Sequence, residues 1–120
     1  MHKRLFLVED SPVIRQTMVE MLEDLAEVEV VAWSEAEAEA IATMKRTEWD
    51  VALVDLFLKE GSGLGVVRAF RSREKEKLLF VVTNYATAEM RRRCKELGAD
   101  RTFDKSTELD QLVAALLAKL

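Results

Sequence analysis

Five side chains of this sequence combine the chemistry needed to handle a metal ion and a phosphoryl group. Three are carboxylates, one is a hydroxyl and one is an ammonium group: Glu9, Asp10, Asp55, Thr83 and Lys105. Clustered carboxylates stay ionised together only when a cation neutralises them, and oxygen ligands without His or Cys favour Mg²⁺. An Asp beside such an ion can become an aspartyl phosphate, while Lys and Thr side chains bind the phosphoryl oxygens. This chemistry requires a fold that brings all five together.

Short apolar runs precede these residues and predict strands. The runs are rich in Val, Leu and Phe, and three are continuous, as is typical of strands buried on both faces of a parallel sheet. They are Leu5–Val8, Val28–Trp33, Val51–Val54, Leu78–Val82 and a weaker run around Thr102–Phe103. Each of the five side chains follows the end of a run. Because the carboxyl ends of parallel strands meet at one edge of the sheet, we expect these side chains to converge there.

Helical patterns alternate with the apolar runs. Apolar spacing, or a composition of Glu and Ala, predicts helices in residues 12–25, 35–40, 64–70, 90–97 and 109–120. Ser11 followed by Pro12 is expected to cap and open the first helix. Ser34 with Glu37 resembles a capping box for the second, and Gly98 is expected to end the fourth. Five strands alternating with five helices indicate an α/β protein with helices on both faces of a parallel sheet.

Length and composition limit the class of protein. With 120 residues, 49% of them hydrophobic and 33% charged, residues 1–120 are expected to form one domain. If this is the whole chain, there is no room for a receptor, a second enzyme domain or a DNA-binding module. The net charge of −4 argues weakly against direct binding of nucleic acid. A single cysteine, Cys94, and the lack of a long apolar segment predict a cytoplasmic protein that does not enter the membrane.

The sequence resembles the receiver domain of two-component response regulators, from Lys3 to the last helix. The motifs that carry the resemblance are Leu5-Phe6-Leu7-Val8-Glu9-Asp10-Ser11, Val54-Asp55-Leu56, Gly61-Ser62-Gly63-Leu64, Val82-Thr83-Asn84, Gly98-Ala99-Asp100 and Asp104-Lys105. The resemblance implies a (βα)5 flavodoxin-like three-layer sandwich with a five-stranded parallel sheet in the order 2-1-3-4-5, an order that chemotaxis receivers illustrate.

The resemblance also implies a role for each candidate residue. Asp55 would accept a phosphoryl group from a sensor histidine kinase or phosphotransfer protein, so the chain would be a signalling switch and not an enzyme acting on a metabolite. Mg²⁺ would be bound directly by Asp10 and Asp55, through water by Glu9, and by the backbone carbonyl of Phe57. Two further side chains would contact the phosphoryl oxygens: Lys105 and Thr83. Phosphorylation would then repack the face formed by the fourth helix, fifth strand and fifth helix, which would bind a downstream protein.

Three positions depart from the usual receiver pattern. Thr102 stands where the family has a Tyr or Phe, and its neighbour Phe103 is expected to point into the core on the other side of the strand. The usual aromatic switch is therefore in doubt. Ser106 replaces the Pro that commonly follows Lys105, which makes a cis peptide bond unexpected there. Lys59 replaces a frequent Pro in the loop after the phosphoacceptor, which predicts a less stiff loop.

Two aromatic residues are expected to flank the phosphoryl group. Phe57 and Tyr85 lie two positions beyond Asp55 and Thr83. We hypothesise that their rings restrict attack by water and prolong the phosphorylated state; the alternative is a pair of surface aromatics without a kinetic role. Tyr85 is also a candidate substitute for the missing switch aromatic.

Surface charges offer docking sites as a further hypothesis. A basic cluster lies in the fourth predicted helix and is either a solvated face or a docking surface for an acidic partner: Arg91, Arg92, Arg93 and Lys95. The start of the first helix, with Ile14 and Arg15, is where a kinase would dock in the family. His2 is the only histidine, so the chain is not expected to be the phosphohistidine donor.

Two alternatives to a stand-alone phosphoacceptor remain open. One is a phosphorylation-independent adaptor that uses the fold only as a binding surface. The other is the excised receiver of a longer transcriptional regulator. A small hydrolase with an Asp nucleophile is disfavoured because the sequence has no insertion for substrate binding.

Overall fold

The computed structural model describes residues 2–118 and shows five strands alternating with five helices. The strands are β1 (Lys3–Val8), β2 (Val28–Ser34), β3 (Val51–Val54), β4 (Leu78–Thr83) and β5 (Arg101–Asp104). The helices are α1 (Pro12–Leu25), α2 (Glu37–Lys45), α3 (Gly63–Ala69), α4 (Ala88–Leu97) and α5 (Leu109–Ala118). The last two residues predicted for the final helix, 119–120, lie outside the described residues. None of the helices within residues 2–118 has the length and apolar character needed to cross a membrane.

The strands form one parallel sheet in the order β2-β1-β3-β4-β5. The α/β fold and strand order predicted from the sequence are therefore confirmed. All four residues of the central strand β3 are buried, which explains why its sequence is continuously apolar. The register places Val8 beside Val54 and Thr83 beside Asp104, so neighbouring strands end at the same level.

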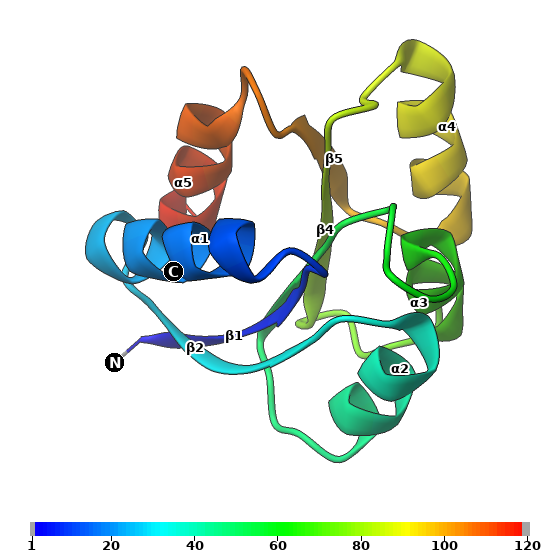
Figure 1. The fold of residues 1–120 in the computed structure, drawn as a ribbon, viewed down its shortest axis with the longest axis horizontal. Helices are drawn as coiled ribbons and strands as arrows, with labels where there is room; N and C mark the ends of the chain where they lie inside the picture. The colour runs from blue at the N-terminus through cyan, green and yellow to red at the C-terminus, as the bar shows by residue number, and fades with distance from the viewer. Residues whose placement is uncertain (1, 119–120) are drawn as a thin grey trace.

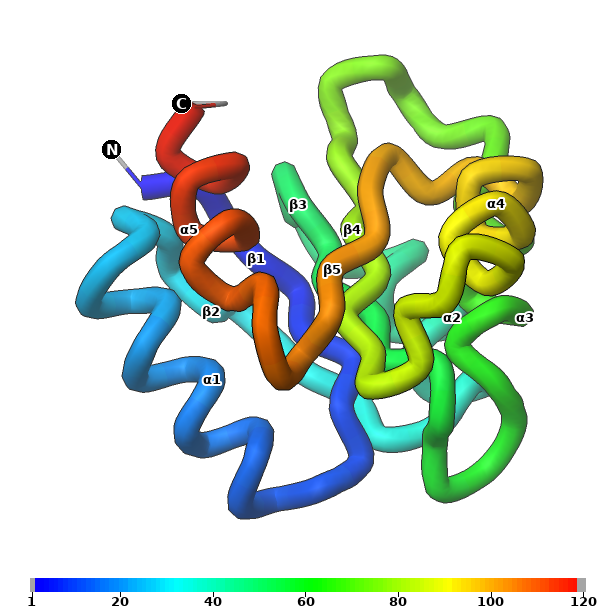
Figure 2. The backbone as a smooth tube through the Cα atoms, turned by 90° about the horizontal axis from the view of Figure 1, so that it is seen from above, coloured from blue at the N-terminus to red at the C-terminus, as the bar shows by residue number. Residues whose placement is uncertain are grey.

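Helices cover both faces of the sheet, with α1 and α5 on one side and α2, α3 and α4 on the other (Figures 1 and 2). On the first side, Leu7 and Leu53 of the sheet pack in one buried cluster with Leu22 of α1 and Leu112 of α5. Alternate strand residues pack on the second side with α2, α3 and α4. Two apolar layers thus hold the sheet between the helices, and the site lies at the edge of this packed core.

The caps of α1 and α4 form as predicted. The Ser11 hydroxyl accepts from the backbone N–H of Ile14, and Pro12 occupies the first turn of α1. Gly98 ends α4 with a φ of 116°, a left-handed conformation that favours glycine. The apolar face predicted for α1 is buried at Met18 and Leu22 and half-buried at Met21, whereas Ile14 and Leu25, near the two ends of the helix, are exposed.

The capping box predicted for α2 is wrong. Ser34 is the last residue of β2, where its carbonyl accepts from Glu9 N–H, and the helix begins at Glu37. Ala36 is the N-cap and makes no side-chain cap. A backbone group takes the place of a side-chain cap, because the N–H at the start of α2, that of Glu37, donates to the Glu60 carbonyl at 3.0 Å. The connection between β2 and α2 is therefore held by a distant loop and not by its own serine.

Candidate functional site

The carboxyl edge of the sheet brings the three predicted carboxylates together. Glu9 and Asp10 follow β1, Asp55 follows β3, and these two strands are neighbours. Asp55 N–H donates to the Val8 carbonyl at 3.0 Å, which continues the strand pairing to the site. One carboxylate oxygen from each of the three residues lies within 4.8 Å of the others. Glu9 and Asp55 are buried and Asp10 is partly exposed, so the cluster opens to solvent on one side.

Lys105 reaches the same cluster from the turn after β5. Its Nζ donates to Glu9 Oε1 at 2.8 Å and to Asp55 Oδ2 at 3.0 Å. Its backbone N–H donates to the Thr83 carbonyl at 2.8 Å, which fixes the start of the side chain. The lysine therefore bridges two buried carboxylates that come from different strands.

The cluster carries an excess of negative charge, because three carboxylates face one ammonium group. Burial raises the pKa of Glu9, and the hydrogen bond from Lys105 only partly opposes this. Burial lowers the pKa of Lys105, but its hydrogen bonds to Glu9 and Asp55 outweigh this and leave the pKa raised. Lys105 is therefore charged at neutral pH. The donor set, all oxygen and unbalanced in charge, fits a hard divalent cation such as Mg²⁺.

Thr83 ends β4 and is completely buried. Its Oγ1 accepts from the Tyr85 backbone N–H at 3.1 Å. A hydroxyl that accepts one hydrogen bond still has its own proton to donate. Thr83 thus lies at the same edge as the carboxylates, one strand away from Asp55.

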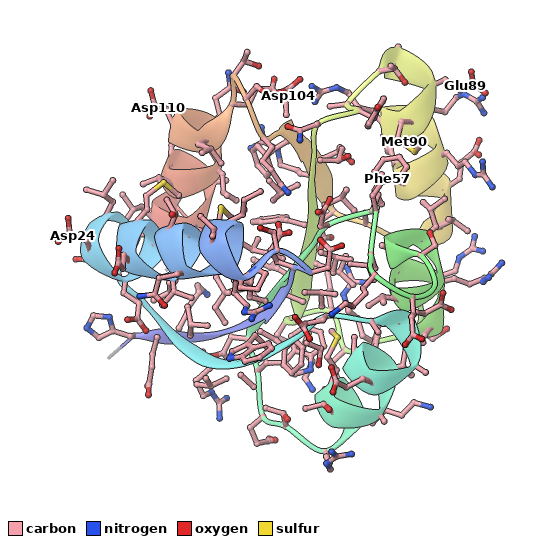
Figure 3. All side chains as sticks on the ribbon, viewed as in Figure 1. Asp24, Phe57, Glu89, Met90, Asp104 and Asp110 are labelled. Atoms are coloured by element: carbon pink, nitrogen blue, oxygen red, sulfur yellow. The ribbon has the colours of Figure 1, made fainter. Side chains whose placement is uncertain are left out.

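Phe57 and Tyr85 meet at this edge. Phe57 projects from the loop after β3 (Figure 3), and its ring centroid lies 4.9 Å from that of Tyr85. Phe57 and Tyr85 are 54% and 60% exposed, respectively, so neither is a core residue. The contact joins the loop after β3 to the loop after β4, which are the loops that follow Asp55 and Thr83.

The departures at β5 have visible consequences. Phe103 is buried and packs edge-on against Phe80 at a centroid distance of 5.5 Å, which confirms the prediction that it is a core residue. Thr102 lies on the opposite side of β5, and its carbonyl accepts from the Arg91 guanidinium at 2.9 Å. No cis peptide bond occurs in the part of the chain that the structure describes. Ser106 donates through its hydroxyl to the Asn84 side-chain oxygen at 3.2 Å.

Two of the four basic residues predicted on α4 are paired with carboxylates. Arg91 pairs with Glu108 at 2.7 Å and also donates to the Ala86 carbonyl. Arg92 pairs with Glu96 at 3.2 Å within the helix. Arg91 therefore links α4 to β5 and to the start of α5.

One arginine near the site has contacts that the sequence did not predict. Arg15 donates to the Glu9 carbonyl at 2.9 Å, forms an ion pair with Glu35 at 3.4 Å and lies over the Trp33 ring at 3.6 Å. It thereby holds the backbone of a site residue against the end of β2. Its place one turn into α1 was visible in the sequence, but no spacing rule connects it with residues 33–35.

A parallel sheet of this order, with clustered carboxylates and a lysine at its carboxyl edge, defines a flavodoxin-like protein with an acidic site at that edge. The family model of the response regulator receiver domain matches residues 5–117. The chain belongs to this family, as the resemblance indicated.

Known relatives agree with the family. The chain is 31% identical over 117 residues to the acid tolerance regulatory protein ActR of Rhizobium meliloti, covering 98% of this chain and 59% of that protein. It is 29% identical over 140 residues to the DNA-binding transcriptional activator DevR/DosR of Mycobacterium tuberculosis, covering 98% and 62%. A two-component response regulator of the LuxR family from Aurantimonas sp. SI85-9A1 superposes with a TM-score of 0.86 at 26% identity, covering 98% and 86%. The chain thus spans about three-fifths of the length of these two curated relatives.

Proposed function

We propose that this chain is a phosphoacceptor switch in which Asp55 receives the phosphoryl group. The observation that carries the proposal is the Lys105 ammonium group, which bridges Glu9 and Asp55 within a cluster of three carboxylates. A carboxylate oxygen of Asp55 attacks the phosphorus of a phosphohistidine. The new P–O bond forms as the P–N bond breaks, and the imidazole leaves with the electron pair of that bond.

The other residues prepare the site for this transfer. Asp10 and Asp55 would hold Mg²⁺ directly, Glu9 would act through water, and the Phe57 carbonyl would complete the protein ligands. When bound there, the ion would supply positive charge near the phosphoryl oxygens. Lys105 exchanges a carboxylate partner for a phosphoryl oxygen, and the Thr83 hydroxyl donates to another. Protein positioning and charge thus account for most of the catalysis that phosphoryl transfer needs.

The partners follow from this role. We propose a sensor histidine kinase or phosphotransfer protein as the donor, docking near Ile14 and Arg15, and a downstream protein as the target of the α4–β5–α5 face. Residues 1–120 would act as one receiver unit in the cytoplasm. Because the curated relatives are longer and one is named as DNA-binding, an excised receiver of a transcriptional regulator remains the second candidate. That this unit itself does not bind nucleic acid stays a prediction.

A mass measurement tests the phosphoacceptor role. The protein is incubated with a small phosphodonor, with and without Mg²⁺, and Asp55→Asn serves as the control. We expect one added phosphoryl group that depends on Mg²⁺ and is absent from the variant. The lack of an adduct would favour the phosphorylation-independent adaptor, and an adduct in Asp55→Asn would remove Asp55 from the assignment.

A further inference from the structure

The loop from Phe57 to Ser62, between Asp55 and α3, is closed at its base by local contacts. Gly63 N–H donates to the Leu56 carbonyl at 2.9 Å, and Phe57 bridges Ser62 across the loop. A Cβ at Gly63 would collide with the Asp55 carbonyl, so α3 begins directly against the backbone of the proposed phosphoacceptor. These contacts hold the two ends of the loop together, but they leave its outer part to be held from elsewhere.

Helix α2 holds the outer part of this loop. Ala36 and Glu60 form a parallel backbone bridge, and Glu37 N–H donates to the Glu60 carbonyl. The Glu37 side chain adds a second connection, because its Oε1 accepts from the Ser62 backbone N–H at 2.8 Å. One residue at the start of α2 thus binds the loop through both its backbone and its carboxylate, 25 positions away from Ser62 in the sequence.

Two glycines make room for this carboxylate. A Cβ at Gly61 would lie 2.5 Å from Glu37 Cβ, and Gly61 also has a φ of +81°. A Cβ at Gly65, in the first turns of α3, would overlap the Glu37 carboxylate. Glycine is a poorer helix former than alanine, so Gly65 in the first turn of α3 gives up some intrinsic helix preference in exchange for this space. The Glu37 carboxylate is therefore packed closely between the loop and the start of α3.

We propose that Glu37 is a positioning residue for the metal site: its carboxylate fixes the loop that carries the Phe57 carbonyl, and so sets the affinity for Mg²⁺. This inference rests on the proposed function, because the Phe57 carbonyl is a Mg²⁺ ligand only in that proposal. Lys59 leaves the loop without a stiffening proline, and the Glu37 hydrogen bond supplies a constraint from outside the loop. The carboxylate acts as a hydrogen-bond acceptor here, so a neutral acceptor of the same length should keep most of its role.

An NMR titration of the ¹⁵N-labelled protein with MgCl₂ tests this role. We expect Glu37→Ala to weaken Mg²⁺ binding by about fivefold, the equivalent of one lost hydrogen bond. Glu37→Gln keeps an acceptor of the same length and is expected to stay within twofold of wild type. Glu39→Ala is the matched control, since it removes an exposed carboxylate from the same helix turn whose hydrogen bond, from Glu35 N–H at 3.3 Å, lies outside the loop. Amide hydrogen exchange at Ser62 should quicken in Glu37→Ala and not in the other two variants.

Gly65→Ala provides a second route that does not remove Glu37. We expect it to weaken Mg²⁺ binding because the new methyl group displaces the carboxylate. In the Glu37→Ala background the same change should have no further effect on affinity and should stabilise α3. Equal affinities for wild type and Glu37→Ala would overturn the positioning role. So would a loss in Glu37→Gln or in Glu39→Ala as large as the loss in Glu37→Ala. A wild-type protein that binds no Mg²⁺ would instead refute the proposed metal site itself.

Discussion

Replacing Lys105 with methionine removes the ammonium group that donates to both Glu9 and Asp55. Methionine has similar length and flexibility, so the change deletes charge and hydrogen bonds with little loss of packing. Two buried carboxylates would then face each other and Asp10 without a cation. We expect Lys105→Met to be folded but clearly less stable than wild type when no divalent ion is present.

The burial of these side chains sets the size of the effect. The side chain of Lys105 is 11% exposed, that of Glu9 3% and that of Asp55 10%. Removing one partner of a buried ion pair costs about 3–5 kcal/mol of stability. Because Asp55 keeps some contact with solvent, we expect a loss near the lower limit, about 3 kcal/mol. For a domain of this size such a loss lowers the melting temperature by roughly 10 °C.

The pH dependence of this difference has a defined sign. The pKa of Lys105 is raised in the folded protein, so its stabilising contribution is fully present below its ordinary pKa and is lost as the pH rises through the folded value. The pKa of Glu9 is also raised, so the folded state favours its protonated form. Removing Lys105 raises it further, and acid therefore stabilises the variant relative to wild type. The gap between the two proteins should be widest near neutral pH and narrow toward both extremes.

Urea denaturation in EDTA and then in MgCl₂ measures this gap. Mg²⁺ should stabilise Lys105→Met more than wild type, because the ion replaces the missing positive charge. Lys95→Met is the control, since Lys95 is exposed on α4, and it should change the free energy of unfolding by less than about 0.5 kcal/mol. A Lys105→Met protein as stable as wild type in EDTA, with the same response to Mg²⁺, would refute the charge imbalance inferred for this site.

Three further predictions concern the aromatic pair beside the site and two residues of α4. Replacing Phe57 and Tyr85 together with serine should speed loss of the phosphoryl group severalfold in a dephosphorylation time course; an unchanged rate would leave the rings without a kinetic role. The Arg91 hydrogen bond lowers the pKa of Glu108, so the stabilisation is present above the ordinary Glu pKa and is lost as the pH falls through the folded value. Arg91→Ala should therefore be less stable than wild type at neutral pH, with a difference that shrinks in acid; a pH-independent difference in thermal melts would contradict the ion pair. Burial raises the pKa of the Cys94 thiol, so alkylation by iodoacetamide should be slow in the native protein and fast in urea; rapid native alkylation would argue against this packing.

The strands and the convergence of the site were predictable because both depend on local sequence. Continuous apolar runs such as Val51–Val54 match buried parallel strands, and a residue that follows such a run must lie at the carboxyl edge. Glu9, Asp55 and Lys105 could thus be placed together although Lys105 is 96 positions away from Glu9. The identity of the residue after each strand was sufficient for this prediction.

Contacts between loops and helices were not predictable, because they depend on tertiary packing. The Ser34–Glu37 spacing has the form of a capping box, yet Ser34 is held in the sheet by Glu9, and Glu37 instead binds Ser62. Likewise the basic residues of α4 suggested a solvated or partner-binding face, but Arg91 forms an ion pair with Glu108 in the connection between β5 and α5. Short sequence patterns describe what a side chain can do, and the fold decides which partner is within reach.

Reduction of the phosphorylated protein with borohydride tests the central claim most directly. Borohydride reduces an acyl phosphate to an alcohol with release of phosphate, so a phosphorylated aspartate becomes homoserine, which peptide mass spectrometry locates. We predict homoserine at position 55 in protein treated with phosphodonor and Mg²⁺, and unmodified Asp55 when either is left out. Homoserine at position 10, or an aspartate at position 55 that stays unmodified under all conditions, would contradict the account.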